Sequence, residues 1–392
     1  MRRLSRALAV AALCLAASAA GAESFVPTAD DEVLERLPLA PLAPSARRLR
    51  DLRAELAARP RSSGRATDLA WRYIEQGRAL SDPRFFGYAE GVLAPWWSVA
   101  APPPAVLLLR ATLRQHDHDF PAALRDLEQT LRADPANAQA WLTQAVVQQV
   151  RGDYAAARAS CLEMRAQPLL TVTCVSGVDS LSGQAARAYT ALRRALTNAV
   201  AADRANRRWA LTTLAEIAAR RGAATAAAAH FRQALALAER DDYLLGAYAD
   251  FLLDQGRPDE VRTLLRGFTG SDALLLRLTL AERQLAAAET STHIGMLRDR
   301  FAAARLRGDS VHRREEARFT LSLLGDPAAA LTLARANWEV QREPADARLL
   351  LDAALAVDDA AAARPALAFL AASGLEDVTL RQQIAALGAA PS

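Results

Sequence analysis

The feature that most constrains how this chain can fold is an internal period of 34 residues. Small and aromatic residues recur at this spacing in neighbouring segments: Ala111 and Ala145, Phe120 and Tyr154, Ala123 and Ala157, Ala215 and Ala249, and Gly222 and Gly256. Each segment has the apolar spacing of two helices joined by a turn. Such a period predicts stacked helical repeats, in which each unit buries its apolar face against its neighbours.

The clearest unit lies between Arg207 and Glu239. Ala215 falls within its first helix, and Gly222 ends that helix with a residue that reverses the chain without a Cβ penalty. The second helix carries one apolar stripe at i, i+4, i+7 and i+8: Ala227, Phe231, Ala234 and Leu235. Small residues at the crossing allow the two helices to approach closely, and the aromatic ring fills the wedge below them.

Glycine, alanine and aromatic residues at these positions resemble the tetratricopeptide repeat (TPR). The resemblance extends over roughly residues 67–372 and is weakest at both ends, where capping units face water. It implies an all-α fold, a right-handed α-solenoid of antiparallel helix pairs. The period is irregular in the centre, because Gly152 to Gly183 spans 31 residues and Gly183 to Gly222 spans 39. We therefore expect the curvature of the array to change there.

Composition and repeat spacing divide the chain into five segments. They are a signal peptide at 1–22, an N-terminal extension at 23–60, a TPR-like repeat array at 61–270, a long-helix spacer unit at 271–311, and degenerate TPR-like repeats with a C-terminal cap at 312–392. The spacer is expected because residues 272–307 predict two long helices, with no glycine before Gly295. The proline-rich stretch 95–104, which includes Trp96 and Trp97, predicts a loop between units.

The first 22 residues have the pattern of a secretory signal peptide. Three arginines precede an apolar stretch too short to span a bilayer, and A-x-A cleavage sites follow at 17–19 and 20–22. An uncleaved membrane anchor is the alternative. Export would place the mature chain, which starts at Glu23 if the second site is used, in the periplasm or, alternatively, outside the cell. No later segment has 18 consecutive apolar residues, so we expect no membrane insertion after cleavage.

Bulk charge argues against binding to nucleic acid or another polyanion. The formal charge of the chain is +4, and removal of residues 1–22, which contain three arginines and no acids, leaves +1. The basic residues are all arginine, and they are scattered among acidic residues instead of forming a basic face. The use of arginine alone is best explained by codon bias in a GC-rich genome.

Two cysteines, Cys161 and Cys174, remain in the mature chain. They fall on the second helix of one unit and on the first helix of the next, and these helices should pack side by side. An exported compartment is oxidising, and two thiols allow only one pairing. We therefore predict a Cys161–Cys174 disulfide, with two buried free thiols as the alternative.

His116 and His118, interleaved with Asp117 and Asp119, form the cluster that most resembles a set of metal ligands. They lie in the turn between two repeat helices, where a solvated polar loop is normal, and no third histidine or H-E-x-x-H motif accompanies them. The chain also lacks G-x-S-x-G, G-x-x-x-x-G-K and G-x-G-x-x-G motifs. The sequence therefore predicts no metal, no cofactor and no enzymatic activity.

A polar and aromatic cluster lies at a helix end in the C-terminal part of the chain: Asn337, Trp338, Gln341, Glu343 and Pro344. Trp338 has two interpretations. It is an exposed anchor for a partner, since tryptophan is enriched at binding hot spots, or it fills the junction with the next unit.

TPR solenoids generally present a concave groove built from the first helix of each pair. By that resemblance the groove of this chain contains nine residues: Leu142, Val146, Gln149, Trp209, Thr212, Glu216, Arg220, Asp250 and Asp254. It has no cluster of basic residues that would hold the terminal carboxylate of a peptide. The resemblance implies an exported, non-catalytic scaffold that mediates protein–protein interaction by binding a protein or peptide partner in this groove. The alternative is an accessory or carrier subunit of a system that secretes or assembles a polysaccharide or another envelope component.

Overall fold

The computed structural model describes residues 44–80, 82–199, 201–237, 240–309 and 311–389. The predicted signal peptide and most of the predicted N-terminal extension lie outside these residues. The chain divides into a unit of residues 1–48 and a compact unit of residues 49–392. The described residues contain no β-strand, which confirms the predicted all-α fold. None of the described helices is both long and apolar enough to cross a membrane.

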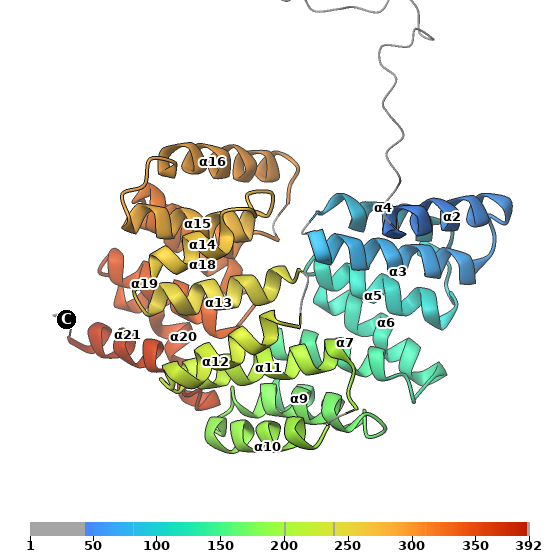
Figure 1. Cartoon of the computed structure of the whole chain (residues 1–392), viewed down its shortest axis with the longest axis horizontal. Helices are drawn as coiled ribbons and strands as arrows, with labels where there is room; N and C mark the ends of the chain where they lie inside the picture. Colours follow the sequence, from blue (N-terminus) through green and yellow to red (C-terminus); the bar gives the residue numbers. More distant parts are fainter. Residues whose placement is uncertain (1–43, 81, 200, 238–239, 310, 390–392) are drawn as a thin grey trace, which may run out of the picture. The chain divides into compact units, whose positions relative to one another are not determined.

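Twenty α-helices and one π-helical turn make up the described part of the chain (Figure 1). In chain order they are α2 (Pro44–Ala58), α3 (Ser63–Leu80), α4 (Arg84–Trp97), α5 (Pro104–His116), α6 (Phe120–Ala133), α7 (Ala138–Val150), α8 (Tyr154–Leu162), α9 (Pro168–Asp179), α10 (Ala185–Asn198), α11 (Arg204–Arg220), α12 (Ala224–Leu235), α13 (Asp242–Asp254), α14 (Pro258–Leu265), α15 (Asp272–Gln284), α16 (Thr290–Leu306), α17 (Arg313–Phe319), η1 (Thr320–Leu324), α18 (Pro327–Trp338), α19 (Pro344–Ala356), α20 (Ala360–Ser373) and α21 (Val378–Ala389). From α3 onward, each odd-numbered helix up to α15 packs against the helix that follows it, and each pair packs against a neighbouring pair. This is the α-solenoid of helix pairs that the repeat spacing predicts.

Short polar side chains determine where several helices begin. The Asp119 carboxylate accepts a hydrogen bond from the Ala122 amide at the start of α6, and Asn137 caps α7 in the same way. Asp203 and Asp241 cap α11 and α13, the two first helices that carry most of the predicted groove. An N-cap of this kind satisfies a backbone N–H group that has no partner inside the helix.

The turn inside a helix pair needs one residue in the left-handed region. Gly152 and Gly222 occupy it with φ of 83° and 77°, a conformation that costs about 1–2 kcal/mol for a residue with a side chain. His118 takes this position between α5 and α6 with φ of 60°. The imidazole therefore stands where other units have glycine.

The central turns also contact helices that are distant in sequence. A Cβ atom on Gly152 would lie 2.6 Å from the ring of Phe369 on α20. The Arg342 amide, just before α19, donates a hydrogen bond of 2.8 Å to the carbonyl of Val150, the last residue of α7. Within residues 49–392 the array therefore curves so tightly that its third pair touches its last pairs.

A disulfide joins Cys161 on α8 to Cys174 on α9, and the two Cα atoms are 5.5 Å apart. Both sulfurs lie in a buried cluster with Tyr154 and Met164. This is the pairing that the sequence predicts, and it lies where the repeat spacing is irregular.

The structure corrects two details of the sequence interpretation. Trp96 and Trp97 lie in the last turn of α4, with Pro95 inside the helix, so the loop predicted over 95–104 is confined to residues 98–103. Proline is tolerated there because it removes only one hydrogen bond near the helix end. Within the expected spacer, α15 has 13 residues, the same length as α13, and only α16, with 17, is long. The five-segment division itself stays a prediction.

Trp338 is 4% exposed, and its ring packs edge-on against Phe369 at a centroid distance of 5.5 Å. It therefore fills the junction between α18 and α20 and is not an exposed anchor.

The close approach at Gly152 predicts a large cost for adding one methyl group. We expect Gly152→Ala to lower the free energy of unfolding by about 2–4 kcal/mol, because left-handed strain and overpacking against Phe369 add together. Gly256→Ala is the matched control, since Gly256 has φ of 64° and no atom within 4 Å of the added Cβ. Its expected loss is about 1 kcal/mol. Urea unfolding measures both, and equal losses would contradict the packing role of the Gly152 turn.

The disulfide predicts redox-sensitive stability. Reduction of the mature protein should lower its free energy of unfolding by about 3 kcal/mol, the value expected for closing a short loop. The double variant Cys161→Ser/Cys174→Ser should unfold at the same urea concentration with and without reductant. Thiol titration of the denatured, unreduced mature protein should find none; two titratable thiols would be incompatible with the bridge.

Candidate functional site

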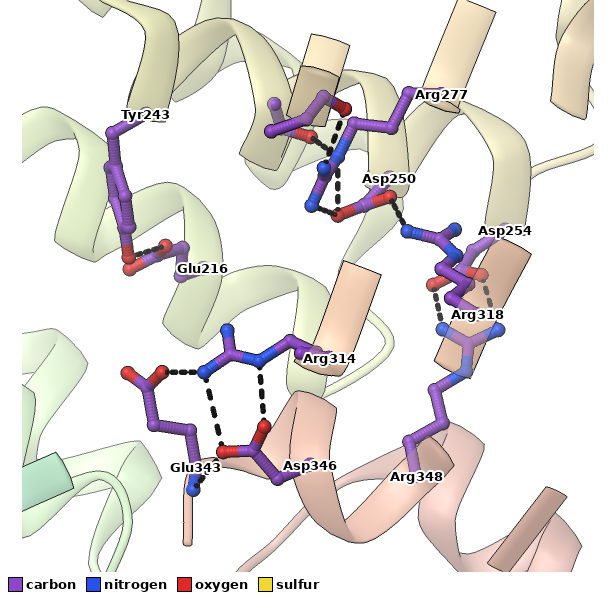
Figure 2. Close-up of polar contacts among 12 residues, drawn as sticks. Glu216, Tyr243, Asp250, Asp254, Arg277, Arg314, Arg318, Glu343, Asp346 and Arg348 are labelled. Carbon is purple, nitrogen blue, oxygen red and sulfur yellow. Dashed lines mark hydrogen bonds and ion pairs between the residues drawn. The ribbon is translucent and has the colours of Figure 1, made fainter. Parts of the chain in front are cut away.

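Charged side chains line the inner face of the array, where the first helices of successive pairs converge. Ten residues form what we call the inner network (Figure 2): Glu216 on α11; Tyr243, Asp250 and Asp254 on α13; Arg277 on α15; Arg314 and Arg318 on α17; Glu343 at the N-cap of α19; and Asp346 and Arg348 on α19. Arg348 reaches Asp254, which lies three pairs earlier in the array. Such a contact places these helices on the inside of the curve.

Asp250 joins three first helices. Its Oδ2 atom lies 2.6 Å from Arg277 of α15, and its Oδ1 atom lies 2.6 Å from Arg318 of α17. Burial alone would raise the pKa of Asp250, but the two guanidinium groups outweigh it and lower the pKa to about 2. The carboxylate therefore remains ionised at neutral pH and holds α13, α15 and α17 together.

A bidentate pair extends this connection to α19. Both terminal nitrogens of Arg348 donate to the carboxylate of Asp254 at 2.7 Å. Burial alone would lower the pKa of Arg348, but the hydrogen bonds and charge of Asp254 and the charge of Asp352 raise it. Paired, planar geometry of this kind makes an arginine–carboxylate contact directional as well as strong.

Arg314 links α17 to the start of α19. It donates to Asp346 at 2.6 Å, to Gln341 at 3.0 Å and to Glu343. Burial alone would lower the pKa of Arg314, but the charges of Asp346 and Glu343 raise it well above its usual value. Asp346 also accepts a 2.7 Å bond from the Asn337 amide. Glu343 and Asp346 form the capping box of α19, so the same carboxylates that start this helix bind the arginine.

Glu216 differs from the other carboxylates of the inner network, because within the described ranges it makes no ion pair with an arginine. Its Oε1 atom accepts a 2.6 Å hydrogen bond from the hydroxyl of Tyr243. Burial and the charge of Glu343 raise the pKa of Glu216 against the opposing effects of Arg220 and the Tyr243 bond. The charge of Glu216, then burial and Glu343, raise the pKa of Tyr243 well above its usual value. Burial acts on the hydroxyl end of Tyr243, whereas the residue as a whole is 67% exposed.

A second tyrosine, on α8, is buried. Tyr154, at the start of α8, is 8% exposed, and its hydroxyl makes no hydrogen bond to any described residue. Burial, together with the charge of Glu343, raises the pKa of Tyr154, and Arg220 opposes them. Arg220 itself donates to the Ser180 hydroxyl at 2.7 Å.

The histidine cluster has a packing role. His116 stacks on the ring of Phe86 at a centroid distance of 3.7 Å, and burial, followed by the charges of His118 and His312, lowers the pKa of His116 to about 4. Its neighbours Asp117 and His118 line a cavity of about 70 Å³ together with three residues of the C-terminal pairs: Arg313, Asn337 and Val340. Over the described ranges, no group of three or more side chains has the arrangement of a metal site.

Comparison with known proteins rests on solved structures, since no protein-family model and no curated protein matches the chain. The chain is similar to the solved structure of the APC/C hetero-tetramer Cut9–Hcn1, with 12% identity and a TM-score of 0.50, over 83% of this chain and 63% of that one. It is also similar to a tetratricopeptide repeat protein from Parabacteroides merdae, with 12% identity and a TM-score of 0.35, over 72% and 98% of the two chains. PilW, a type IV pilus biogenesis factor, shows 16% identity and a TM-score of 0.40 over 51% of this chain and 94% of its own.

The helix pairs have left-handed turn residues and small residues at their crossings, and the likeness to Cut9–Hcn1 agrees with this arrangement. The chain has the fold of a tetratricopeptide-repeat solenoid.

The structure places the predicted groove residues in two groups. Four belong to or adjoin the inner network: Glu216, Arg220, Asp250 and Asp254. The other five lie on α7 and α11 outside the network: Leu142, Val146, Gln149, Trp209 and Thr212. Of these, Thr212 is buried and donates to the carbonyl of Arg208, and Trp209 packs against the cluster around the disulfide. Partner binding by any of the nine stays a prediction.

Sequence reasoning missed most of the residues that complete the network, because those of α17 and α19 belong to C-terminal units in which the repeat pattern is weak. Arg314 and Arg318 are four residues apart, and this spacing places both on one face of α17. The sequence also contained a partial signal, since Glu343 and Gln341 belong to the polar cluster that follows Trp338. Three-dimensional contact was needed to show that this cluster faces Glu216 and Tyr243.

The low pKa of Asp250 predicts how its contribution to the free energy of unfolding depends on pH. Asp250→Asn should lower the free energy of unfolding at pH 7 by about 1–3 kcal/mol, since Arg277 and Arg318 lose their shared carboxylate. The folded pKa lies below the unfolded value, so this stabilisation is complete above about pH 4 and is lost as the pH falls toward 2. Urea unfolding at pH 7, 4 and 2.5 should therefore show a shrinking difference from wild type. The exposed control Asp299→Asn should change stability by less than about 0.5 kcal/mol, and a pH-independent loss at Asp250 would contradict the assignment.

Proposed function

We propose that this protein is an exported, non-catalytic scaffold that binds a protein or peptide partner on its inner face. The proposal joins two kinds of support. The N-terminal sequence has the pattern of a signal peptide and directs the chain to the periplasm, and the TPR solenoid provides a fold built for holding other chains.

The observation that carries the proposal is the exposure of Tyr243. Tyr243 is 67% exposed, and its hydroxyl donates to Glu216 on the inner face. Tyrosine is enriched at interfaces because it adds a large apolar contact area and a hydrogen-bonding hydroxyl at a small entropic cost. An exposed aromatic ring among fixed polar groups is the arrangement that a protein or peptide ligand uses.

The ion pairs of the inner network limit where a partner fits. Asp250 and Asp254 bind arginines of α15, α17 and α19, so these carboxylates serve to close the array. The docking position therefore centres on Glu216 and Tyr243 instead of extending along the whole predicted groove.

A crosslinking experiment tests the scaffold. Tagged protein, expressed in its native host with its own signal peptide, is mildly crosslinked and recovered from the periplasmic fraction, and captured proteins are identified by mass spectrometry. We expect one or more proteins to be captured by wild type and by Tyr88→Ala, the control at a tyrosine of α4 that is 49% exposed, and at least about tenfold less by Tyr243→Ala. Absence of the protein from the periplasm would contradict export. Equal capture by all three proteins, or no capture, would contradict partner binding at the inner face.

A further inference from the structure

We propose that the inner face recognises a basic side chain, the guanidinium of arginine or the ammonium of lysine, in the peptide segment of its partner, held between Tyr243 and the carboxylates of Glu216 and Glu343. The inference rests on the proposed function and specifies the chemistry of the partner at that same site.

Glu216 is the exception in a network that otherwise pairs its acids. Asp250, Asp254, Glu343 and Asp346 each bind an arginine of the chain. Glu216 accepts only the hydroxyl of Tyr243, and within the described residues it has no arginine in ion-pair contact. An ionised carboxylate that protein surrounds is stabilised when a cation approaches it. A cation from the ligand would form with Glu216 the kind of ion pair that the arginines of the chain form with the other four carboxylates.

The charges around Tyr243 have the sign that attracts a cation. The charged groups that act on Glu216 and Tyr243 are the carboxylates of the two glutamates, Glu216 and Glu343, and the guanidinium of Arg220. Arg314 donates to Glu343, Asp346 and Gln341. In Figure 2, the Glu216–Tyr243 pair lies across the inner face from the Arg314–Glu343 pair. Acidic groups therefore lie on both sides of the position that a ligand would take.

The exposed ring of Tyr243 is suited to the same ligand. An aromatic face attracts a cation through its quadrupole, and arginine also stacks on it through its planar guanidinium. The chain uses this contact internally, because Arg53 lies 5.3 Å from the ring centre of Tyr73 and Arg240 lies 5.3 Å from that of Phe268. Tyr243 has no such arginine among the described residues, so its exposed ring remains available to one from a partner.

An unbiased peptide selection tests the inference. A random twelve-residue display library is selected on the mature wild-type protein, with counter-selection on Tyr243→Ala. We expect the recovered peptides to be enriched in arginine or lysine at one position. For a synthetic peptide of the selected sequence, replacement of that residue by glutamine should weaken binding by about tenfold or more, and binding should weaken as salt is added, because the contact is electrostatic.

Variants of the protein separate recognition from stability. Glu216→Gln should weaken binding of the basic peptide by about tenfold and leave binding of its glutamine version unchanged. Tyr243→Phe keeps the ring and should retain more affinity than Tyr243→Ala. Glu289→Gln is the matched control. Glu289 is an exposed acid at the N-cap of α16 that pairs with Arg262 of α14, and this variant should bind like wild type. Thermal unfolding by circular dichroism verifies that all variants are folded at the assay temperature.

The possible outcomes distinguish this inference from the function on which it rests. Selected peptides that are acidic, or that bind at Tyr243 without any preference for charge, would overturn the basic-side-chain inference and leave the scaffold in place. Binding of a basic peptide that Glu216→Gln does not weaken would also overturn it. Recovery of no peptide that depends on Tyr243 would count against partner binding at the inner face itself.

Discussion

The ion pairs of Asp250 hold together the first helices that converge on the inner face; we call this convergence the closure of the inner face. A single carboxylate binds arginines from the next two pairs, and the neighbouring Asp254 binds an arginine one pair further on. Ion pairs that span so many repeats require the first helices to converge, and convergence requires a tight curve. The close contacts between Gly152 and Phe369 and between Arg342 and Val150 are consistent with that curvature. Closure therefore rests on electrostatic pairing inside the curve and on packing where distant turns meet.

This closure changes what the inner face offers to a partner. A solenoid with an open groove would present its first helices along their whole length. Here the carboxylates of α13 are bound by arginines of α15, α17 and α19. Tyr243 of α13, in contrast, is 67% exposed, and its hydroxyl donates to Glu216 of α11. The position for recognition is therefore local, and it is bordered by the capping box that starts α19.

Much of the fold was predictable because local rules act independently in each repeat. The spacing of Ala215, Gly222 and Phe231 predicts a helix, a left-handed turn and a second helix, and the structure contains all three. Glu216 and Arg220 were assigned to the groove through the resemblance to the tetratricopeptide repeat. Tyr243 was missed, although it lies on the same helix as the predicted Asp250. No local sequence pattern predicts the ion pairs that join α17 and α19 to α13, because these contacts depend on the summed rotation of several repeats.

The sequence by itself determined the all-α solenoid, the position of its clearest turns and the single pairing open to Cys161 and Cys174. These features follow from helix periodicity, from the conformational freedom of glycine and from the number of thiols, all of which act over short distances along the chain. Only the tertiary structure decided which acids are neutralised and which one, Glu216, has a tyrosine in place of an arginine. The physical reason is that an ion pair depends on distance in space, and the curvature of the array sets that distance between repeats far apart in sequence.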